Sequence, residues 1–365
     1  MPTNLVPALD PAPLPGPPWL FHLLWVVTFL VHLLFVNAVL GGSILAALAG
    51  PRTGGRETQG FFVAANSWAI SFAITFGIAP LLFMQVLFGR FFYSATILVA
   101  WAWFGMLGLL LAGYYLNYVA KYRLRDGKPA TAILGVEALC FLAIAAIQVT
   151  VNLLHLRPAR WQGVADRAWS ALADPTFLPR FLHFVLAAVA MAGVMLAFVA
   201  VRRAARGADA ATSRSMAGYG LKAALVTTML QLADGFWLLF ALPEDVLRSF
   251  MRGGAATMVP LTLGILAGVV LLVVLAQITD PLAQAAKVRR VAELIVGAIV
   301  VMVVTRHQLR DFYLSEARAD EQVTVATQWG ALLLFLAVFV LCLGLVFYAF
   351  RRAATDRPSQ GEQAA

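Results

Sequence analysis

The chain has 365 residues, of which 61% are hydrophobic and 12% are charged, and its mean hydropathy is +0.83. This composition excludes an ordinary water-soluble domain and indicates an integral membrane protein with lipid as its surroundings. The formal net charge is +9, but membrane proteins collect Lys and Arg in their cytoplasmic loops, so we expect no nucleic-acid partner.

Residues 1–17 are rich in proline and lack a basic start and a cleavage site, which predicts an extended periplasmic arm and not a signal peptide. Apolar segments long enough to cross about 30 Å of hydrocarbon then recur along the chain. The sequence predicts an all-α, polytopic membrane helix bundle over residues 18–351 and a disordered cytoplasmic tail over 352–365. The nine expected transmembrane helices are 18–49, 60–88, 95–121, 131–154, 179–201, 216–241, 257–279, 290–306 and 325–350.

The connections between these segments alternate in charge. Divided at the helix midpoints, one side holds 17 Lys and Arg against 8 Asp and Glu, and the other side holds 10 of each sign. The positive-inside tendency makes the first side cytoplasmic. The N-terminus is therefore expected outside and the C-terminus inside, as in a bacterial inner membrane.

The five histidines all fall toward the predicted outer side. His22 and His32 lie in the first segment, His155 ends the fourth, His183 begins the fifth and His307 ends the eighth. An ionisable residue within a membrane helix is costly unless it meets a partner, and neutral imidazole is the usual axial ligand of a non-covalent haem iron. For His22, His155 and His307, a plain position at the membrane surface is the alternative.

Arginines accompany these histidines. Arg180 precedes His183 by three residues, Arg306 and Arg310 flank His307, and Arg157 and Arg160 follow His155. A guanidinium suits bidentate contact with haem propionates at the membrane edge, and contact with lipid headgroups is the alternative.

Two further polar residues, Gln231 and Asp234, lie in the outer part of the sixth segment. A carboxylate there is placed to accept the proton that a quinol releases on oxidation, with Gln231 beside it. The alternative is that Asp234 pairs with Arg90 or Arg180. Glu137, near the cytoplasmic start of the fourth segment, is expected to be structural.

Five tryptophans are expected in the aromatic belt at the outer membrane surface. They are Trp19, Trp25, Trp161, Trp237 and Trp329. The two cysteines, Cys140 and Cys342, have no paired spacing, so disulfide, zinc, iron–sulfur and covalently attached haem are unsupported.

Three segments resemble subunit I of cytochrome bd quinol oxidase: VHLLFVNAVLGGSILAALAG (31–50), FAITFGIAPLLFMQVLFGRFFYS (72–94) and RFLHFVLAAVAMAGVMLAFVAVRRAARG (180–207). They are similar to the first, second and fifth helices of that subunit, and the nine-helix plan agrees with it. The resemblance implies that His32 and His183 are haem ligands, that the cofactor is haem b in one or two copies, and that quinol or quinone is the substrate.

The sequence also departs from that family. The third segment has no acid where the family has glutamates, and the loop LPEDVLRSFMRGGAA (242–256) replaces a long quinol-binding loop. The haem-ligating Met of the seventh helix has no counterpart, since Gly264 stands there and Met258 is one and a half turns away. TRHQLRDFYL (305–314) replaces the GRQPW signature. These losses argue against oxygen reduction, and they make His307, or else His155, the candidate second imidazole opposite His183 or His32.

We therefore expect an electron-transfer subunit: a membrane b-type cytochrome that exchanges electrons between quinol and a periplasmic carrier such as a c-type cytochrome. One alternative is a divergent bd-type oxidase that still reduces oxygen. Another is a haem-free transporter or assembly subunit, although the middle of the membrane is nearly free of charge.

Overall fold

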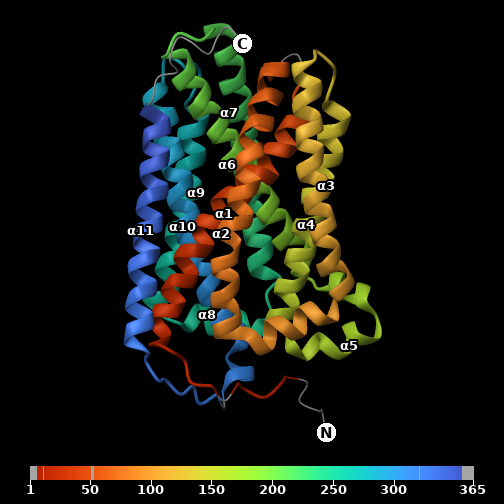
Figure 1. The fold of residues 1–365 in the computed structure, drawn as a ribbon, viewed down its shortest axis with the longest axis vertical. Coiled ribbons are helices and arrows are strands. Elements are labelled where there is room, and N and C mark those ends of the chain that lie inside the picture. The colour runs from red at the N-terminus through yellow and green to blue at the C-terminus, as the bar shows by residue number, and fades with distance from the viewer. Residues whose placement is uncertain (1–5, 11, 51–52, 320, 356–365) are drawn as a thin grey trace.

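The computed structural model describes residues 6–10, 12–50, 53–319 and 321–355, and within these it is an all-α helix bundle (Figure 1). Short 3-10 helices follow α4, α5 and α10. The eleven α-helices are α1 (Pro18–Leu48), α2 (Gly55–Leu98), α3 (Ala100–Arg125), α4 (Thr131–Leu156), α5 (Trp161–Asp166), α6 (Phe177–Ala204), α7 (Ala210–Phe240), α8 (Glu244–Arg252), α9 (Ala255–Ala276), α10 (Ala285–Leu314) and α11 (Trp329–Thr355).

Each of the nine predicted segments corresponds to a long helix, and eight of these helices are long and apolar enough to cross a membrane. The protein is therefore a multi-pass membrane protein. The exception by length and composition is α10, which has charged residues at both ends. It nevertheless packs against α9 and α6 and runs along the bundle with them (Figure 1).

The largest differences from the predicted boundaries occur in α2 and α10. The predicted end of the second segment, Phe88, is a kink with non-helical dihedral angles, φ −138° and ψ 25°, after which α2 continues to Leu98. Helix α10 continues two turns beyond its predicted end at 306. These charged and aromatic turns extend beyond an apolar core of about 30 Å, which is why hydropathy alone does not include them.

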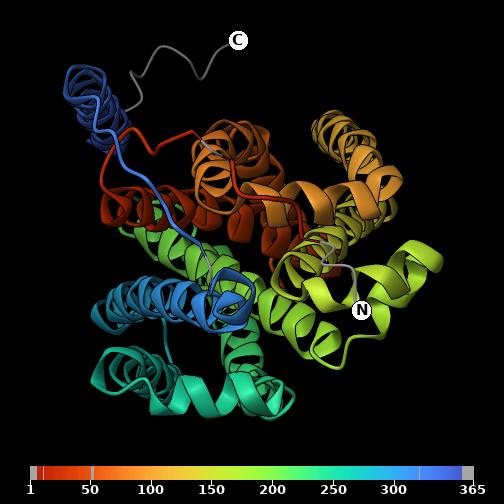
Figure 2. The same ribbon diagram turned by 90° about the horizontal axis from the view of Figure 1, so that it is seen from below.

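The end of the bundle where α1 begins and α10 ends is at the bottom of Figure 1, and we call it the outer end because of the charge distribution. The described residues of the arm preceding α1 form no helix, and the arm crosses this end (Figure 2). Its Leu14 pairs with Val325 in the connection to α11. At the other end, α11 remains helical to Thr355, so 352–355 are not disordered, and the rest of the predicted tail lies outside the described residues.

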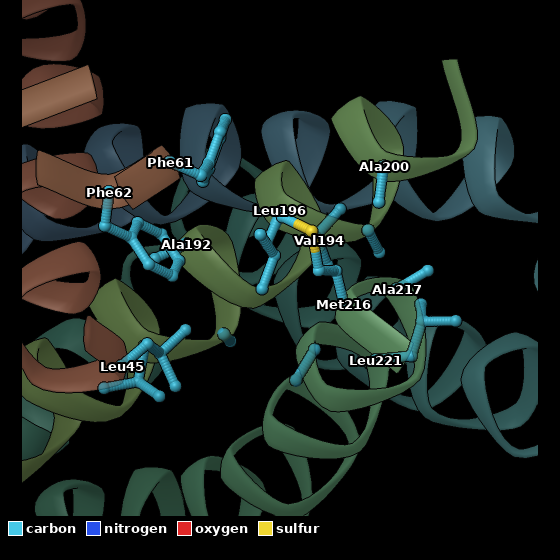
Figure 3. Packing of buried hydrophobic residues seen from close by; sticks show 14 of the residues in the cluster. Leu45, Phe61, Phe62, Ala192, Val194, Leu196, Ala200, Met216, Ala217 and Leu221 are labelled. Atoms are coloured by element: carbon cyan, nitrogen blue, oxygen red, sulfur yellow. The ribbon is translucent and has the colours of Figure 1, made fainter. Parts of the chain in front are cut away.

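The helices that cross at the centre do so through small residues. A Cβ atom built on Gly193 of α6 would lie 2.4 Å from the carbonyl oxygen of Gly220 on α7. One built on Gly41 of α1 would lie 2.0 Å from the carbonyl oxygen of Ala188. Since lipid gives helices no hydrophobic reason to associate, such close backbone approach stabilises the bundle by van der Waals contact. Figure 3 shows the buried apolar cluster that surrounds the α6 and α7 crossing.

Two of the tryptophans expected in the aromatic belt are instead in the interior. Trp25 is 1% exposed and Trp161 is 3% exposed, whereas Trp19, Trp237 and Trp329 face outward as predicted. The indole of Trp161 donates to the carbonyl of Leu154, which ties the loop after α4 back to that helix. Trp25 packs against the polar cluster described next.

Candidate cofactor site

Three histidines from three helices gather near the kink of α2. His22 of α1 and His155 of α4 each pack edge-to-face against the buried Phe88 ring. Their ring centroids lie 5.9 and 5.7 Å from the Phe88 centroid. His307 of α10 lies beside His22, with centroids 5.0 Å apart, and stacks on Trp25 at 4.9 Å. The kink at Phe88 therefore brings an aromatic ring between imidazoles that are far apart in sequence. His22 is one of the group and is not simply a residue at the membrane surface.

His22 and His307 form a hydrogen bond whose direction follows from Arg310. The Arg310 Nη1 atom lies 3.5 Å from His307 Nδ1, and a guanidinium only donates, so His307 Nδ1 accepts. The proton of neutral His307 is therefore on Nε2, which donates to His22 Nδ1 at 3.0 Å. This leaves the proton of His22 on Nε2.

Arg306 and Arg310 are buried at the same place. Arg310 is 2% exposed, and its guanidinium carbon lies 4.2 Å from the ring centroid of Trp25 and 5.1 Å from that of Phe88. Arg306 lies over Phe29 at 4.8 Å and donates through Nη2 to the amide oxygen of Asn152 at 2.8 Å. The Nη1 atom of Arg306 and the Nε atom of Arg310 have no hydrogen-bond partner.

Of the acids near these two arginines, Glu321 and Asp174 are engaged with other arginines, whereas Asp311 interacts electrostatically with Arg310 without forming an ion pair. Glu321 pairs with Arg90 at 2.5 Å and with Arg318 at 2.6 Å. Asp174 pairs with both Arg157 and Arg160. The sequence had suggested these two arginines as contacts for haem propionates, but the ion pairs already engage them. Among the described residues, no carboxylate forms an ion pair with Arg306 or Arg310. Buried charges are normally paired with opposite charges. The two buried guanidinium groups therefore favour the binding of an anion at this place.

His155 is also without polar partners. It is 2% exposed, and neither its Nδ1 nor its Nε2 atom has a hydrogen-bond partner. The rings of Phe88 and Phe91 contact it edge to face, at 5.7 and 6.2 Å. A buried polar group left unsatisfied costs about 1–3 kcal/mol, so this ring nitrogen pair is suited to a ligand such as a metal ion.

His32 lies deeper in the bundle, against α2. Its Nδ1 atom is 2.8 Å from the carbonyl oxygen of Ala73, so Nδ1 carries the proton and donates, and Nε2 keeps its lone pair. Gly77 makes room for the ring, since a Cβ atom there would lie 2.9 Å from the His32 Cε1 atom. An imidazole whose other nitrogen donates to a carbonyl is the usual arrangement of a metal-ligating histidine.

His183 of α6 shows the same feature with a carboxylate. Its Nδ1 atom is 3.2 Å from Asp234 Oδ2, and the amide nitrogen of Gln231 is 3.3 Å from its Nε2 atom. Because the amide donates, Nε2 accepts and Nδ1–H donates to Asp234. The second oxygen of Asp234, Oδ1, has no partner. The structure thus joins two predicted site residues through His183, and the expected ion pair of Asp234 with Arg90 or Arg180 is not formed.

Arg180 lies one turn before His183, as the sequence implies. It contacts Tyr313 of α10, with its guanidinium carbon 5.9 Å from the ring centroid and Nη2 3.5 Å from the hydroxyl oxygen. Its Nε atom has no partner. Arg180 therefore adds a third guanidinium, without a carboxylate in ion-pair contact, to the outer end of α6 and α10.

An open cavity of about 350 Å³ leads from the outer surface to the histidine pair. It is polar, and it gives solvent a route to the His22 ring. Residues that line it are His22, Asp311, Ser315, Arg318, Glu321 and Val323. Sequence reasoning did not find this cavity, because His22 and the segment 311–323 are almost 300 residues apart.

The donor set fits a haem in its chemistry. It offers imidazole nitrogens with free lone pairs, two imidazoles oriented by a second hydrogen bond, and buried guanidinium groups able to bind carboxylates. Among the described residues, no group of three or more His, Cys, Asp and Glu side chains comes together. No protein-family model matches the sequence, and no curated protein is significantly similar to it.

Proposed function

We propose that the protein is a membrane-embedded b-type cytochrome, located in a bacterial inner membrane, that transfers electrons between quinol or quinone and a periplasmic carrier such as a c-type cytochrome. The observation that carries this proposal is that a buried imidazole without hydrogen-bond partners, His155, lies near Arg306 and Arg310, two buried guanidinium groups that form no ion pair with a described carboxylate. Iron and propionate are the two parts of haem that these groups would bind.

The ligand assignments follow from the hydrogen bonds of each imidazole. His32 presents Nε2 with a free lone pair while its Nδ1–H donates to Ala73, so it is the first candidate for an iron ligand. His183 is the second: its Nδ1–H donates to Asp234, and the Gln231 amide that now donates to its Nε2 would have to give way to iron. His155, with both ring nitrogens unpartnered, is the further candidate at the outer end, whereas both ring nitrogens of His307 are engaged with His22 and Arg310. Haem b, when bound, supplies one-electron chemistry that no side chain here supplies.

The chain's own acid and base groups would handle the proton side of quinol oxidation. A quinol loses two electrons and two protons, and the protons must pass to groups near the outer surface. Asp234 has an unpartnered oxygen, Oδ1, while Oδ2 orients His183. Asp234 is thus a candidate proton acceptor beside a candidate iron ligand, with Gln231 as the donor that contacts the same ring.

The first experiment is a reduced-minus-oxidised spectrum with a pyridine haemochrome count on detergent-purified protein expressed with haem supply. The proposal expects low-spin haem b, one or two per chain. His155→Ala and His183→Ala should each lose haem, and Gln308→Ala, next to His307 in the sequence but directed toward α9, should not. Absence of haem from the wild-type protein would overturn the proposal. A carbon monoxide-binding, oxygen-consuming protein would instead indicate the terminal oxidase.

A further inference from the structure

Glu137 lies at the opposite end of the bundle from the histidines. It is in the second turn of α4, and its exposed fraction is 0%. The prediction that it is a structural acid at the surface end of a helix does not account for this burial. The side chain points between α1 and α2, where it meets Ser43 and Asn66.

The hydrogen bonds of this group are unevenly distributed over its two oxygens. The Ser43 hydroxyl donates to Glu137 Oε1 at 3.0 Å, and the Asn66 amide donates to the same oxygen at 3.4 Å and to Ser43 Oγ at 3.0 Å. Glu137 Oε2 is buried without a partner, and so is the Asn66 amide oxygen. Two acceptor oxygens of one buried cluster thus lack a hydrogen to bind.

Among the described residues, no Lys, Arg or His forms an ion pair with Glu137. Neither α1 nor α2 contributes a titratable group to the cluster, since Ser43 and Asn66 are neutral. On α3 and α6, Lys121 and Arg203 at this end contact aromatic rings. The nearest titratable group on α4 itself is the Cys140 thiol, one turn further on. A carboxylate buried in a membrane helix without a cation is strongly disfavoured, so a proton is the simplest way to neutralise it.

We propose that Glu137 is a proton-binding site in the cytoplasmic half of the membrane. At rest the carboxyl is neutral, with its proton on Oε2 and Oε1 accepting from Ser43 and Asn66. Release breaks the Oε2–H bond and passes the proton to water at the cytoplasmic end, leaving a carboxylate that the two donors still bind. This inference does not depend on haem or on the proposed electron transfer.

The route to the cytoplasmic end passes a second polar layer. The buried amide of Gln59 donates to Thr131 Oγ1 at 3.1 Å and lies within 3.4 Å of the carbonyl oxygens of Ala46 and Ala49. Thr131 is exposed at the start of α4, six residues or roughly 9 Å along the helix from Glu137. Gln59 and Thr131 therefore provide polar groups between Glu137 and the solvent at the cytoplasmic end.

A sodium ion is the competing occupant. It would need several oxygens directed at one point, whereas the Ser43 hydroxyl and the Asn66 amide both direct hydrogens at the carboxylate. The arrangement of donors therefore favours the proton, and the experiment below separates the two.

The test uses dicyclohexylcarbodiimide, which reacts with protonated carboxyl groups in apolar surroundings, on the purified full-length protein. Mass spectrometry should find the label on Glu137 near neutral pH, and labelling should decline as the pH rises. Ser43→Ala removes a donor that stabilises the charged form, so the midpoint of labelling should move to higher pH. Glu137→Gln should abolish the label entirely.

The matched control is Glu293 of α10, at the same end of the bundle but with a side chain that is 66% exposed and paired with Arg289. Glu293 should stay unlabelled, and Glu293→Gln should leave the labelling of Glu137 unchanged. If sodium chloride protects Glu137, with potassium chloride of equal strength as reference, the site binds sodium and the proposal is wrong. It is equally overturned if Glu137 resists the reagent at every pH and infrared spectroscopy shows that Glu137→Gln removes an ionised carboxylate band.

Discussion

The Nδ1 atom of His22 lies 3.0 Å from the Nε2 atom of His307, although 285 residues separate the two along the chain. This hydrogen bond joins the first turns of α1 to the last turns of α10, and it is the only direct link between titratable side chains of these helices in the described part of the chain. Arg310 fixes its direction by donating to the other nitrogen of His307. The hydrogen bond between His22 and His307 thus joins α1 and α10, which both contribute residues to the wall of the outer cavity.

Energetic coupling between His22 and His307 is the first prediction. A buried neutral hydrogen bond contributes about 1 kcal/mol, so the effects of His22→Ala and His307→Ala on the free energy of unfolding should be non-additive by about that amount. The measurement is a double-mutant cycle on protein in detergent, by chemical unfolding. His22→Ala combined with Thr227→Ala, which is on another helix, serves as the additive reference. Additive effects of the two histidine replacements would show that the bond contributes nothing to stability.

Replacement of Gly193 tests the close crossing of α6 and α7. A Cβ atom there would lie 2.4 Å from the Gly220 carbonyl oxygen, which belongs to backbone and cannot move aside cheaply. Overpacking of this kind costs about 1–3 kcal/mol, which exceeds the gain in helix propensity of about 1 kcal/mol for Ala over Gly. Gly193→Ala should therefore lower the midpoint of thermal unfolding.

Gly218 supplies the control for this crossing. It is on α7, two residues before Gly220, and a Cβ atom built there meets nothing within 4 Å. Gly218→Ala should leave the unfolding midpoint unchanged or slightly raised. Equal effects of the two replacements would mean that the backbones at the crossing separate without cost.

The sequence predicts the bundle well and the site only in part. The apolar segments of the sequence locate all nine long helices, and eight of these helices are apolar over a length that can cross the hydrocarbon layer. Hydropathy misses the last two turns of α10, which carry Arg310, because those turns are polar and buried by tertiary packing. The pairing of His22 with His307 and of His183 with Asp234 depends on how helices are arranged, and periodicity along one helix holds no information about that.

The loop before α6 should lose a stabilising contact at acid pH. Burial tends to raise the pKa of Asp174, but hydrogen bonds from the hydroxyl and backbone of Thr176, together with Arg160 and Arg157, outweigh it and hold the pKa below its ordinary value. A carboxyl with a depressed pKa in the folded state stabilises the fold at pH values above the unfolded pKa, and that contribution disappears as the pH falls through the folded value.

Hydrogen exchange of the segment 157–176 measures this effect. Protection, meaning the slowing of exchange relative to the intrinsic rate at the same pH, should be high at neutral pH and fall only below the normal range of an aspartate. Asp174→Asn should show low protection already at neutral pH, with no further loss on acidification. Asp245→Asn, in the separate helix α8, is the reference variant. A wild-type loop that is equally protected at all pH values would contradict the assigned role of Asp174.

Arg310 is expected to hold an anionic group of the cofactor. Its guanidinium is 2% exposed and has no carboxylate in ion-pair contact among the described residues. A hydrogen bond to a charged group contributes about 1.5–3 kcal/mol, so Arg310→Gln should weaken haem binding by about tenfold or more. Arg248→Gln, at an exposed ion pair with Glu244 on α8, should leave haem content unchanged. Haem loading by the Arg310 variant equal to wild type would exclude a propionate contact.

The role of His32 is testable through a glycine that it touches. A Cβ atom built on Gly77 would lie 2.9 Å from the His32 Cε1 atom, so Gly77→Ala should push the ring away from the Ala73 carbonyl to which Nδ1–H donates. Losing that hydrogen bond makes the imidazole a weaker electron donor, which destabilises ferric relative to ferrous iron. If His32 ligates haem, the midpoint potential of one haem should therefore become more positive. Gly60→Ala, on the same helix with nothing within 4 Å, should leave the potential unchanged, and an unchanged potential in the Gly77 variant would remove His32 from the ligand set.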